Sequence, residues 1–238
     1  MKSFTLAGIS IINSNYSELL EIIDSSVKTK AEIEITYANF HTLNQIVDQN
    51  LSDLYNSFTI VHSDGIGIYL AIKLLFKNNI SRITGSDFYR ELIDYSIENK
   101  IRLFFFGDTP ETLEMLRKRN DLRIVGTASG YSFSSEKVVD EINIANPDIL
   151  IVGLGSPKQE KWISNNKDKI TTNIIISVGD GIKLFAKTKK RGFSIIQKLG
   201  FEWLIRLINE PKRLWKRYLI GIPLFIFRII KLKLTLSK

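Results

Sequence analysis

The feature that most constrains this fold is a series of short, continuous apolar runs separated by helical patterns. Runs that are continuously apolar, in contrast to alternating ones, are typical of strands buried on both faces of a sheet. The predicted strands are Ile33–Tyr37, Phe58–His62, Ile101–Phe106, Arg123–Gly126, Ile149–Gly153 and Asn173–Val178. Both faces of this sheet therefore need a covering layer.

Amphipathic patterns with helical spacing lie between these runs. They predict helices at Tyr16–Val27, Ser86–Asn99, Pro110–Arg119 and Lys137–Ile144. Strands that alternate with helices indicate an α/β fold with a Rossmann-like, doubly wound and mostly parallel sheet. Right-handed crossovers place the carboxyl ends of the strands at one edge, where such sheets bind ligands.

The residue types limit the possible chemistry. The chain of 238 residues has no cysteine and only two histidines, His41 and His62. This excludes a disulfide framework, a thiolate nucleophile and cysteine-ligated zinc, and two histidines are too few for a histidine-rich metal site. Each histidine is either a candidate base or, as is more common, a structural residue.

The positive charge is concentrated near the C-terminus. Residues 187–238 contain 14 Lys and Arg against 2 Asp and Glu, a balance of +12, whereas residues 1–186 have a balance of −4. We therefore divide the chain into an α/β core at residues 1–192 and a basic helical C-terminal appendage at residues 193–238. Such an appendage indicates an acidic partner, either anionic lipid headgroups or nucleic acid.

The appendage has the pattern of a basic amphipathic helix. One helix is expected at Leu199–Asn209 and a second from Glu210, with Pro211 in its first turn and Pro223 kinking or restarting it. Its basic and apolar side chains fall on different sides: Lys212, Arg213, Lys216 and Arg217 against Leu214, Tyr218, Leu219, Ile222 and Phe225. An apolar stripe suits lipid better than a phosphate backbone, so we expect an anionic membrane surface as partner and no nucleic acid.

The expected location follows from two further segments. The apolar stretch Leu219–Ile230 is interrupted by Pro223 and Arg228 and is shorter than the ~20 residues of a membrane span. Met1–Ile12 shows no signal-peptide pattern. We expect a cytoplasmic protein that lies on a membrane, and apolar surface on the appendage would also favour a homo-oligomer.

Small and polar residues follow most of the predicted strands. They include Asn39, Ser63-Asp64-Gly65, Gly153-Leu154-Gly155-Ser156 and Gly179-Asp180-Gly181. Glycines let the backbone approach a ligand, and helix N-termini offer free N–H groups to phosphate. The isolated Gly153-Leu-Gly155 lacks the third glycine of a dinucleotide fingerprint, so NAD is not expected.

Asp64 is the best candidate for a catalytic base. It follows an apolar strand and precedes a helical pattern at Gly65–Leu75. A partly desolvated carboxylate at such a position has a raised pKa that suits a general base. The alternative is that Asp64 is the N-cap of that helix, since Asp is a favoured cap.

Four other residues are candidates for ligand binding. Arg82 precedes a helix and either grips a diphosphate or is a surface arginine. Asn39 either bonds to a sugar or base or forms an Asx turn. Gln159 either contacts a sugar hydroxyl or is exposed in the first turn of a helix. Tyr131 either stacks on a ligand or closes a turn.

Taken in order, these segments resemble the WecG/TagA/CpsF family of bacterial glycosyltransferases. The resemblance covers roughly residues 4–220. The segments that carry it are Tyr37-Ala-Asn39, Ser63-Asp64-Gly65-Ile66-Gly67, Arg82-Ile-Thr-Gly85-Ser-Asp87, Phe106-Gly107-Asp108, Gly130-Tyr131, Val152-Gly-Leu-Gly-Ser-Pro-Lys-Gln-Glu-Lys-Trp162, Glu202-Trp203-Leu-Ile-Arg206, Glu210-Pro211 and Arg213. Any one of them is weak evidence, whereas their ordered recurrence is specific.

The resemblance implies an inverting hexosyltransferase. It would move a sugar, with N-acetylmannosamine as the best-known case, from a UDP-sugar to a polyprenyl-diphosphate-linked saccharide. Such enzymes serve the synthesis of teichoic acid, capsule or exopolysaccharide at the inner face of the bacterial plasma membrane. The resemblance implies no catalytic metal and no cofactor besides the UDP-sugar substrate.

The resemblance also assigns roles to residues. Asp64 corresponds to the proposed catalytic base. The expected donor-binding residues are Thr36, Asn39, Tyr131, Gly153, Gly155, Ser156 and Gln159, and the expected acceptor-diphosphate residues are Arg82, Arg206, Arg213 and Arg217.

Three departures leave the donor sugar open. Tyr37 stands where the family often has Thr, with Thr36 just before it; Gly179-Asp180-Gly181 adds a carboxylate; and Lys190-Arg191-Gly192-Phe193 replaces a Lys-Arg-Ala-Pro-like stretch.

An alternative function is a non-catalytic module that binds a nucleotide-sugar and docks on membranes, which predicts binding without turnover. Steeply salt-dependent DNA binding would instead indicate a nucleic-acid partner.

Overall fold

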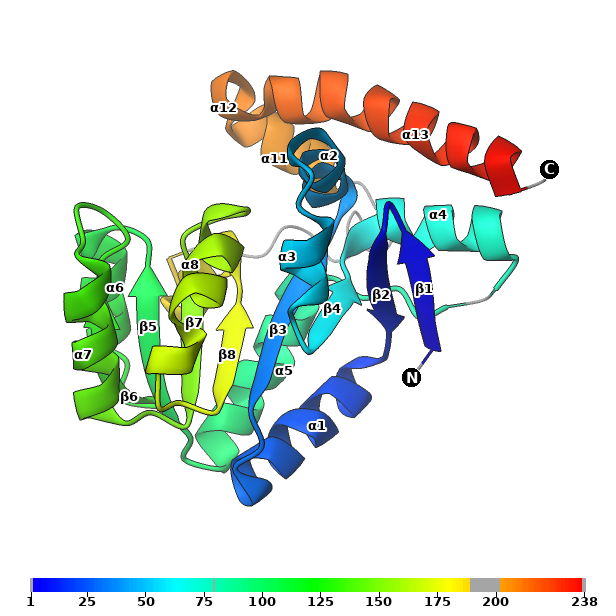
Figure 1. Cartoon of the computed structure of the whole chain (residues 1–238). Helices are drawn as coiled ribbons and strands as arrows, with labels where there is room; N and C mark the ends of the chain where they lie inside the picture. Colours follow the sequence, from blue (N-terminus) through cyan, green and yellow to red (C-terminus); the bar gives the residue numbers. More distant parts are fainter. Residues whose placement is uncertain (1, 79, 189–201, 237–238) are drawn as a thin grey trace.

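The computed structural model describes residues 2–78, 80–188 and 202–236. Its centre is an eight-stranded sheet with the order β1-β2-β4-β3-β8-β7-β5-β6 (Figure 1). The strands are β1 (Lys2–Leu6), β2 (Ile9–Asn13), β3 (Ile33–Ala38), β4 (Ile60–Ser63), β5 (Arg102–Gly107), β6 (Arg123–Ala128), β7 (Ile149–Gly153) and β8 (Ile174–Ser177). All neighbouring strands are parallel except β1 and β2, which confirms the predicted mostly parallel α/β sheet.

The β1–β2 hairpin was not among the predicted strands. Its strands pair antiparallel around Ala7 and Gly8, which both have positive φ, as tight two-residue hairpins require. The burial of β1 alternates because only one face of this strand packs on the core. A search for continuous apolar runs therefore misses it, whereas a period-2 search would find it.

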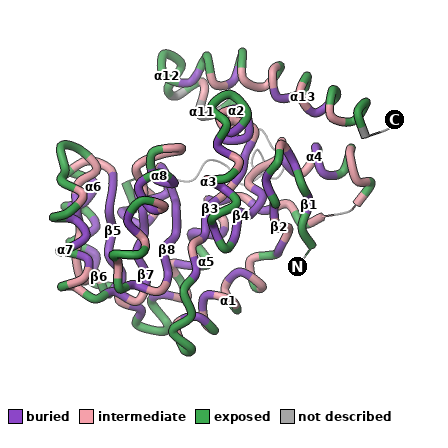
Figure 2. The backbone as a smooth tube through the Cα atoms, viewed as in Figure 1, coloured by how far each residue is buried: buried purple, intermediate pink, exposed green. Residues whose placement is uncertain are grey.

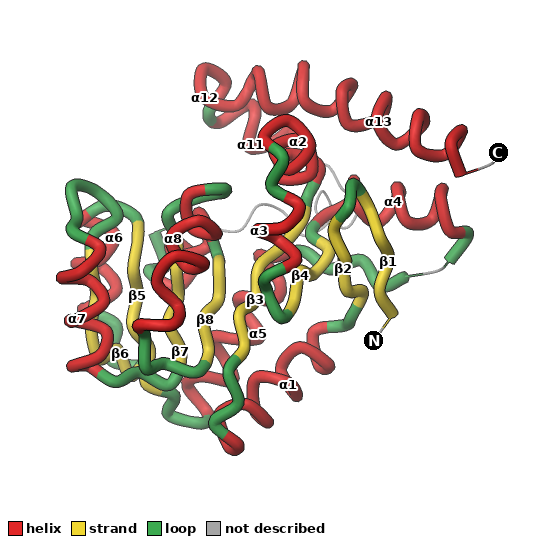
Figure 3. Tube along the Cα trace, viewed as in Figure 1, coloured by secondary structure: helices red, strands yellow, loops and turns green. Residues whose placement is uncertain are grey.

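Helices cover both faces of the sheet, as Figure 3 shows. One face packs against α2 (Phe40–Gln49), α3 (Ser52–Asn56), α4 (Gly65–Phe76), α7 (Ser135–Ala145) and α8 (Lys158–Asn166). The other packs against α1 (Tyr16–Thr29), α5 (Gly85–Glu98), α6 (Pro110–Arg117) and the short α9 (Ile182–Phe185). The four helices predicted between the strands correspond to α1, α5, α6 and α7.

The continuous apolar runs follow from this layering. In β5, Phe104 and Phe106 belong to the core on one face, while Leu103 and Phe105 belong to the core on the other. The central strands are accordingly buried along most of their length (Figure 2). Each such strand removes side chains from water on both sides, and that burial is the main stabilising contribution to this sheet.

The C-terminal segment lies across the carboxyl edge of the sheet (Figure 1). It comprises α11 (Glu202–Asn209), α12 (Pro211–Trp215), a π-helical turn η3 (Lys216–Ile220) and α13 (Gly221–Leu236). The helix predicted to begin near Glu210 is confirmed, and Pro223 lies in the first turn of α13. The proposed domain boundary at residues 192/193, the segment Lys190-Arg191-Gly192-Phe193 and the expected start at Leu199 lie outside the described residues.

The apolar stripe of the appendage has a different role from the predicted one. Leu214, Tyr218 and Phe225 are buried, and the rings of Tyr218 and Phe225 pack against Phe40 of α2 at centroid distances of 5.7 and 6.4 Å. This part of the stripe therefore attaches the appendage to the core and is not free for lipid. In the described part of the chain, no helix is long and apolar enough to cross a membrane.

Candidate active site

A cavity of about 620 Å³ opens at the carboxyl edge of the sheet, between the loops that follow β3, β4 and β8. The neighbouring strands β3 and β8 continue into helices on opposite faces: α2 contributes to one core and α9 to the other. Their loops diverge, and in doubly wound sheets such a divergence creates the ligand-binding crevice. The appendage closes the cavity with side chains of α11, η3 and α13.

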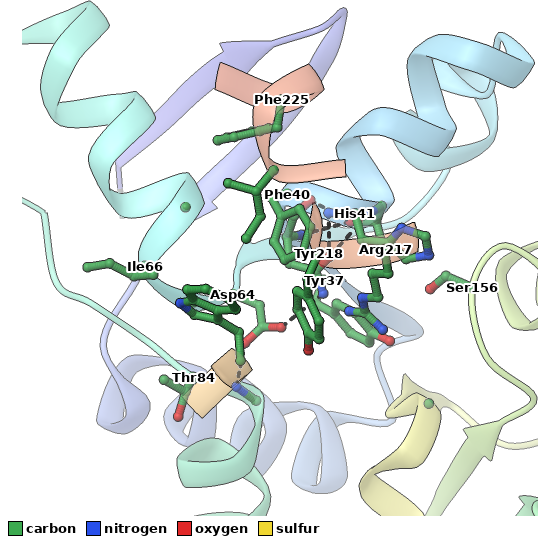
Figure 4. Close-up of a pocket in the computed structure, with 18 of the residues that line it drawn as sticks. Tyr37, Phe40, His41, Asp64, Ile66, Thr84, Ser156, Arg217, Tyr218 and Phe225 are labelled. Atoms are coloured by element: carbon green, nitrogen blue, oxygen red, sulfur yellow. Dashed lines mark hydrogen bonds between the residues drawn. The ribbon is translucent and has the colours of Figure 1, made fainter. Parts of the chain in front are cut away.

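Asp64 lies in the wall of this cavity, directly after β4 (Figure 4). It occupies the N-cap position of α4, but its side chain makes no capping hydrogen bond. Instead, Oδ1 accepts a hydrogen bond from the Gly85 N–H at 2.8 Å, and Oδ2 accepts one from the Asn39 side-chain amide at 3.2 Å. The carboxylate is thus held by two neutral donors beside the cavity.

Asn39 performs two structural tasks at once. Its side-chain oxygen caps α2 by accepting hydrogen bonds from the N–H groups of His41 and Thr42, at 3.0 and 3.1 Å. Its amide nitrogen donates to Asp64. The Asx-type alternative is confirmed, because the side chain caps α2. Asn39 also lines the cavity, and its bonding to a sugar or base stays a prediction.

The predicted arginines converge on the same cavity. Arg82, Arg213 and Arg217 all line it, from the loop before α5, from α12 and from η3. The Arg217 guanidinium lies 5.8 Å from the ring centroid of Phe40 and 5.7 Å from that of Tyr218. Arg206 belongs to α11, but its side chain is outside the described part.

Arg217 has the features of an anion-binding residue. Its Nε has no hydrogen-bond partner among the described residues, and it belongs to a π-helical turn, a feature that is frequent at functional sites. Burial and the nearby Arg217 charge lower the pKa of His41 from 6.5 to about 4. His41 is therefore neutral at pH 7.

A buried carboxylate lies behind the cavity wall. Glu160 of α8 accepts hydrogen bonds through Oε1 from Thr36 at 2.8 Å, Gln159 at 2.9 Å and Ser156 at 3.0 Å. Burial raises the pKa of Glu160, while the hydrogen bonds from Gln159, Thr36 and Ser156 oppose that rise. Glu160 thereby joins the end of β3 to the Gly155–Ser156 turn.

This network also fixes the loop after β8. The side-chain oxygen of Gln159 accepts a hydrogen bond from the Gly179 N–H at 3.1 Å. Gly179 has a φ of +53°, and a Cβ there would meet the Tyr37 hydroxyl at 2.7 Å. The position therefore accepts only glycine without a shift of Tyr37, whose pKa burial raises to about 12.

The predicted donor-binding residues divide into three groups. Asn39, Gly155 and Ser156 line the cavity. Thr36 and Gln159 are buried in the Glu160 network behind the wall, and a Cβ at Gly153 would meet the Gly179 carbonyl oxygen at 2.6 Å, so that glycine allows two loops to approach. Tyr131 is 64% exposed and does not line the described cavity.

Several site features were not predicted from the sequence. Glu160 stands in a quoted motif but carries no signal of its own, because an isolated Glu in a helix is usually solvated. Tyr37 stands in a quoted motif and His41 is one of the two histidines considered as bases, but only the fold shows that both residues line the cavity. The apolar part of the lining, on α4 and α13, joins two segments that are far apart in the chain.

The arrangement suits one kind of chemistry. A positioned carboxylate can accept a proton from a hydroxyl group, and arginines with glycine loops can stabilise a departing diphosphate. Among the described residues, no group of three or more histidines and carboxylates could hold a metal ion.

Comparison with known proteins agrees with this geometry. A model described as "Glycosyl transferase WecG/TagA/CpsF family" matches residues 4–238. A relative from Bacillus subtilis (strain 168), the N-acetylglucosaminyldiphosphoundecaprenol N-acetyl-beta-D-mannosaminyltransferase, is 28% identical over 244 residues, which cover 97% of this chain and 92% of the relative. A relative of the same name from Staphylococcus aureus (strain MW2) is 28% identical over 241 residues, covering 98% and 94%.

Proposed function

Because the chain belongs to the WecG/TagA/CpsF family of glycosyltransferases, we propose that it transfers N-acetylmannosamine from a UDP-sugar to N-acetylglucosamine on a polyprenyl diphosphate. The acceptor and the transferred N-acetylmannosaminyl group are those in the names of its relatives, and the UDP donor is the one that the family resemblance implies. The product would be a lipid-linked disaccharide for a cell-surface polysaccharide.

The observation that carries this proposal is how the Asp64 carboxylate is hydrogen-bonded. At the N-cap of α4 it would ordinarily satisfy the helix N–H groups, yet it does not cap the helix. Gly85 and Asn39 hold it instead beside a cavity lined by arginines. A carboxylate withheld from capping is available as a proton acceptor.

The proposed reaction is a single displacement. The acceptor hydroxyl oxygen attacks C1 of the donor sugar while Asp64 takes the hydroxyl proton. The new C1–O bond forms as the bond between C1 and the diphosphate oxygen breaks, and UDP leaves with the electron pair. Attack opposite the leaving group inverts the configuration at C1.

Positive charge at the cavity would stabilise both diphosphates. We assign Arg82, Arg213 and Arg217 to the acceptor diphosphate. The Gly155–Ser156 turn supplies backbone N–H groups for the donor side. Since these groups carry out electrostatic stabilisation, the proposal includes no catalytic metal.

We place the enzyme peripherally on the inner face of the plasma membrane, where its lipid-linked acceptor resides. Residues 187–238 carry a balance of +12, and a cation near an anionic lipid surface contributes about 1 kcal/mol of attraction.

The test is UDP release with a panel of UDP-sugars and a short-chain prenyl-diphosphate-linked N-acetylglucosamine, with and without EDTA. We expect acceptor-dependent release with UDP-N-acetylmannosamine and no loss of rate in EDTA. Release with another donor would correct the sugar, and loss of rate in EDTA would refute the metal-free proposal.

The alternative of a non-catalytic binding module makes the opposite prediction. Such a protein binds UDP in a calorimeter but releases none from any donor in the presence of the acceptor. This pair of results would refute the transferase proposal while retaining the cavity as a nucleotide site.

A further inference from the structure

The apolar end of the cavity is a groove between α4 and α13. On α4 its lining residues are Ile66, Leu70 and Leu74, and on α13 they are Ile222, Ile226 and Ile230. Each set recurs every four residues, so it forms one row along its helix. The two rows line the same cavity from two helices, and Figure 1 shows α13 above α4, with both helices extending to the right of the view.

The side chains of these two rows are more exposed to solvent than is usual for leucine and isoleucine. Leu70 is 53% exposed, Leu74 42%, Ile226 50% and Ile230 48%. The neighbouring Phe225 and Ile229 of α13 also line the cavity, but they are buried in the core. The groove is thus an apolar surface left open between two helices that are otherwise attached to the molecule.

The groove is continuous with the polar end of the cavity. Ile66 follows Asp64 by two residues, and in Figure 4 Ile66 lies on one side of Asp64 while Ser156 lies on the other. The charged side chains of the cavity wall, Asp64, Arg82, Asp180, Arg213 and Arg217, all come from segments outside the two apolar rows. One cavity therefore combines a carboxylate, cations and an apolar channel.

We infer that this groove binds the first isoprene units of the acceptor lipid. The inference rests on the proposed function and extends it by a lipid subsite. A prenyl-diphosphate-linked sugar carries one group for each part of this cavity: a hydroxyl for Asp64, a diphosphate for the arginines and a branched hydrocarbon for the rows. The eight helical steps from Ile66 to Leu74 give a channel of about 12 Å.

Binding of sugar-free prenyl diphosphates tests the groove without depending on turnover. The probes are pyrophosphate, isopentenyl diphosphate and farnesyl diphosphate, each titrated by calorimetry below its micellar concentration. Because apolar burial strengthens binding with each added CH₂, we expect farnesyl diphosphate to bind about 100-fold more tightly than isopentenyl diphosphate. Equal dissociation constants for the three probes would overturn the inference.

Two neighbouring residues of α13 give a matched pair of variants. Ile226 lines the groove, whereas Phe227 is 63% exposed and does not line it. We expect Ile226→Glu to reduce the ratio of the isopentenyl to the farnesyl diphosphate dissociation constant to below about tenfold, because a charge in the channel opposes hydrocarbon binding. Leu70→Glu should reduce this ratio in the same way from α4. Phe227→Glu should still bind farnesyl diphosphate about 100-fold more tightly than isopentenyl diphosphate.

The outcomes separate the groove from the transferase function. An equal effect of Ile226→Glu and Phe227→Glu would refute the groove and leave the reaction intact. Chain-length-dependent binding combined with no UDP release from any donor would retain the lipid site and refute the transferase. The three substituted side chains are all at least half exposed, so unchanged melting temperatures are expected to confirm that each variant folds.

Discussion

At the scale of single residues, Asp64 carries the sharpest prediction. Asp64→Asn keeps an acceptor for the Gly85 N–H but removes the negative charge that takes the proton in the proposed reaction. We expect kcat to fall by about 10²- to 10⁴-fold, with the melting temperature and UDP affinity unchanged. Asp94→Asn, an exposed carboxyl on α5, is the control. An Asp64→Asn enzyme as active as this control would show that another group is the base.

Glu160 is expected to act through its neighbours, as a positioning residue. Glu160→Ala leaves the side-chain donors of Thr36, Gln159 and Ser156 without their buried acceptor, so we expect a loss of about 3 kcal/mol in unfolding free energy. Glu160→Gln keeps one acceptor oxygen and should lose less than about 1 kcal/mol. For the Gln variant, we expect KM for the donor to rise more than kcat falls, because the Gly155–Ser156 turn moves. Equal denaturation midpoints for the Ala and Gln variants would contradict this role.

His41 predicts how stability depends on pH. Its pKa is lowered in the folded protein from 6.5 to about 4, first by burial and then by Arg217. The unfolded chain therefore binds a proton over a range in which the folded protein does not, and stability is lost as pH falls from about 6.5 to 4. His41→Gln should remove on the order of 1 kcal/mol of this loss, after allowance for partial exposure. Parallel urea titrations of both proteins across this pH range would check it; identical slopes would contradict it.

The sequence pointed to the Asp64 carboxylate and to the arginines of the cavity, but it did not show which neighbours position these side chains. Spacing shows that Asp64 follows a strand, yet the choice between cap and base depends on Gly85, which lies 21 residues away in the chain. Thr36 and Gln159 are expected from the resemblance to bind the donor, and their side chains donate hydrogen bonds to Glu160 behind the wall. Their contact with a donor stays a prediction.

At the scale of elements, continuous apolar runs and helical spacing located the parallel strands and the helices α1, α5, α6 and α7. These patterns could not predict which segments, far apart in the chain, pack against each other. The stripe from Leu214 to Phe225 has the same pattern whether it faces lipid or Phe40, because periodicity reports amphipathicity and not the partner. Only the fold shows that α13 lies on α2.

The attachment of α13 can be tested at Arg228. Its guanidinium donates to the backbone and side-chain oxygens of Asn44 at 3.0 Å each and pairs with Asp48, while Asn44 donates to the Gly221 carbonyl at 2.8 Å. Arg228→Ala should cost about 1–2 kcal/mol and speed amide hydrogen exchange in α13. Lys231→Ala, which removes an exposed cation from the same helix, should change neither quantity. Unaltered exchange in Arg228→Ala would mean that apolar packing alone holds the helix.

At the scale of the whole molecule, charge and apolar exposure coincide on one side. The appendage carries the positive balance, and its exposed apolar residues include Leu219, Ile220, Phe227 and Leu234. It lies at the carboxyl edge, beside the open cavity (Figure 1). A membrane on this side would present a lipid-linked acceptor directly to the groove, so binding to the membrane and binding of the acceptor would use one orientation. The expected homo-oligomer stays a prediction.

This orientation can be measured because the chain has no cysteine. Phe227→Cys and Ile144→Cys each provide one labelling site, the first on the appendage and the second near the end of α7, where the native residue is 85% exposed. With an environment-sensitive dye and vesicles containing phosphatidylglycerol, we expect a blue shift only at position 227. Since attraction between exposed charges is screened by salt, vesicle binding should weaken as ionic strength rises. Equal shifts at both sites, or equal binding to neutral vesicles, would refute docking through the appendage.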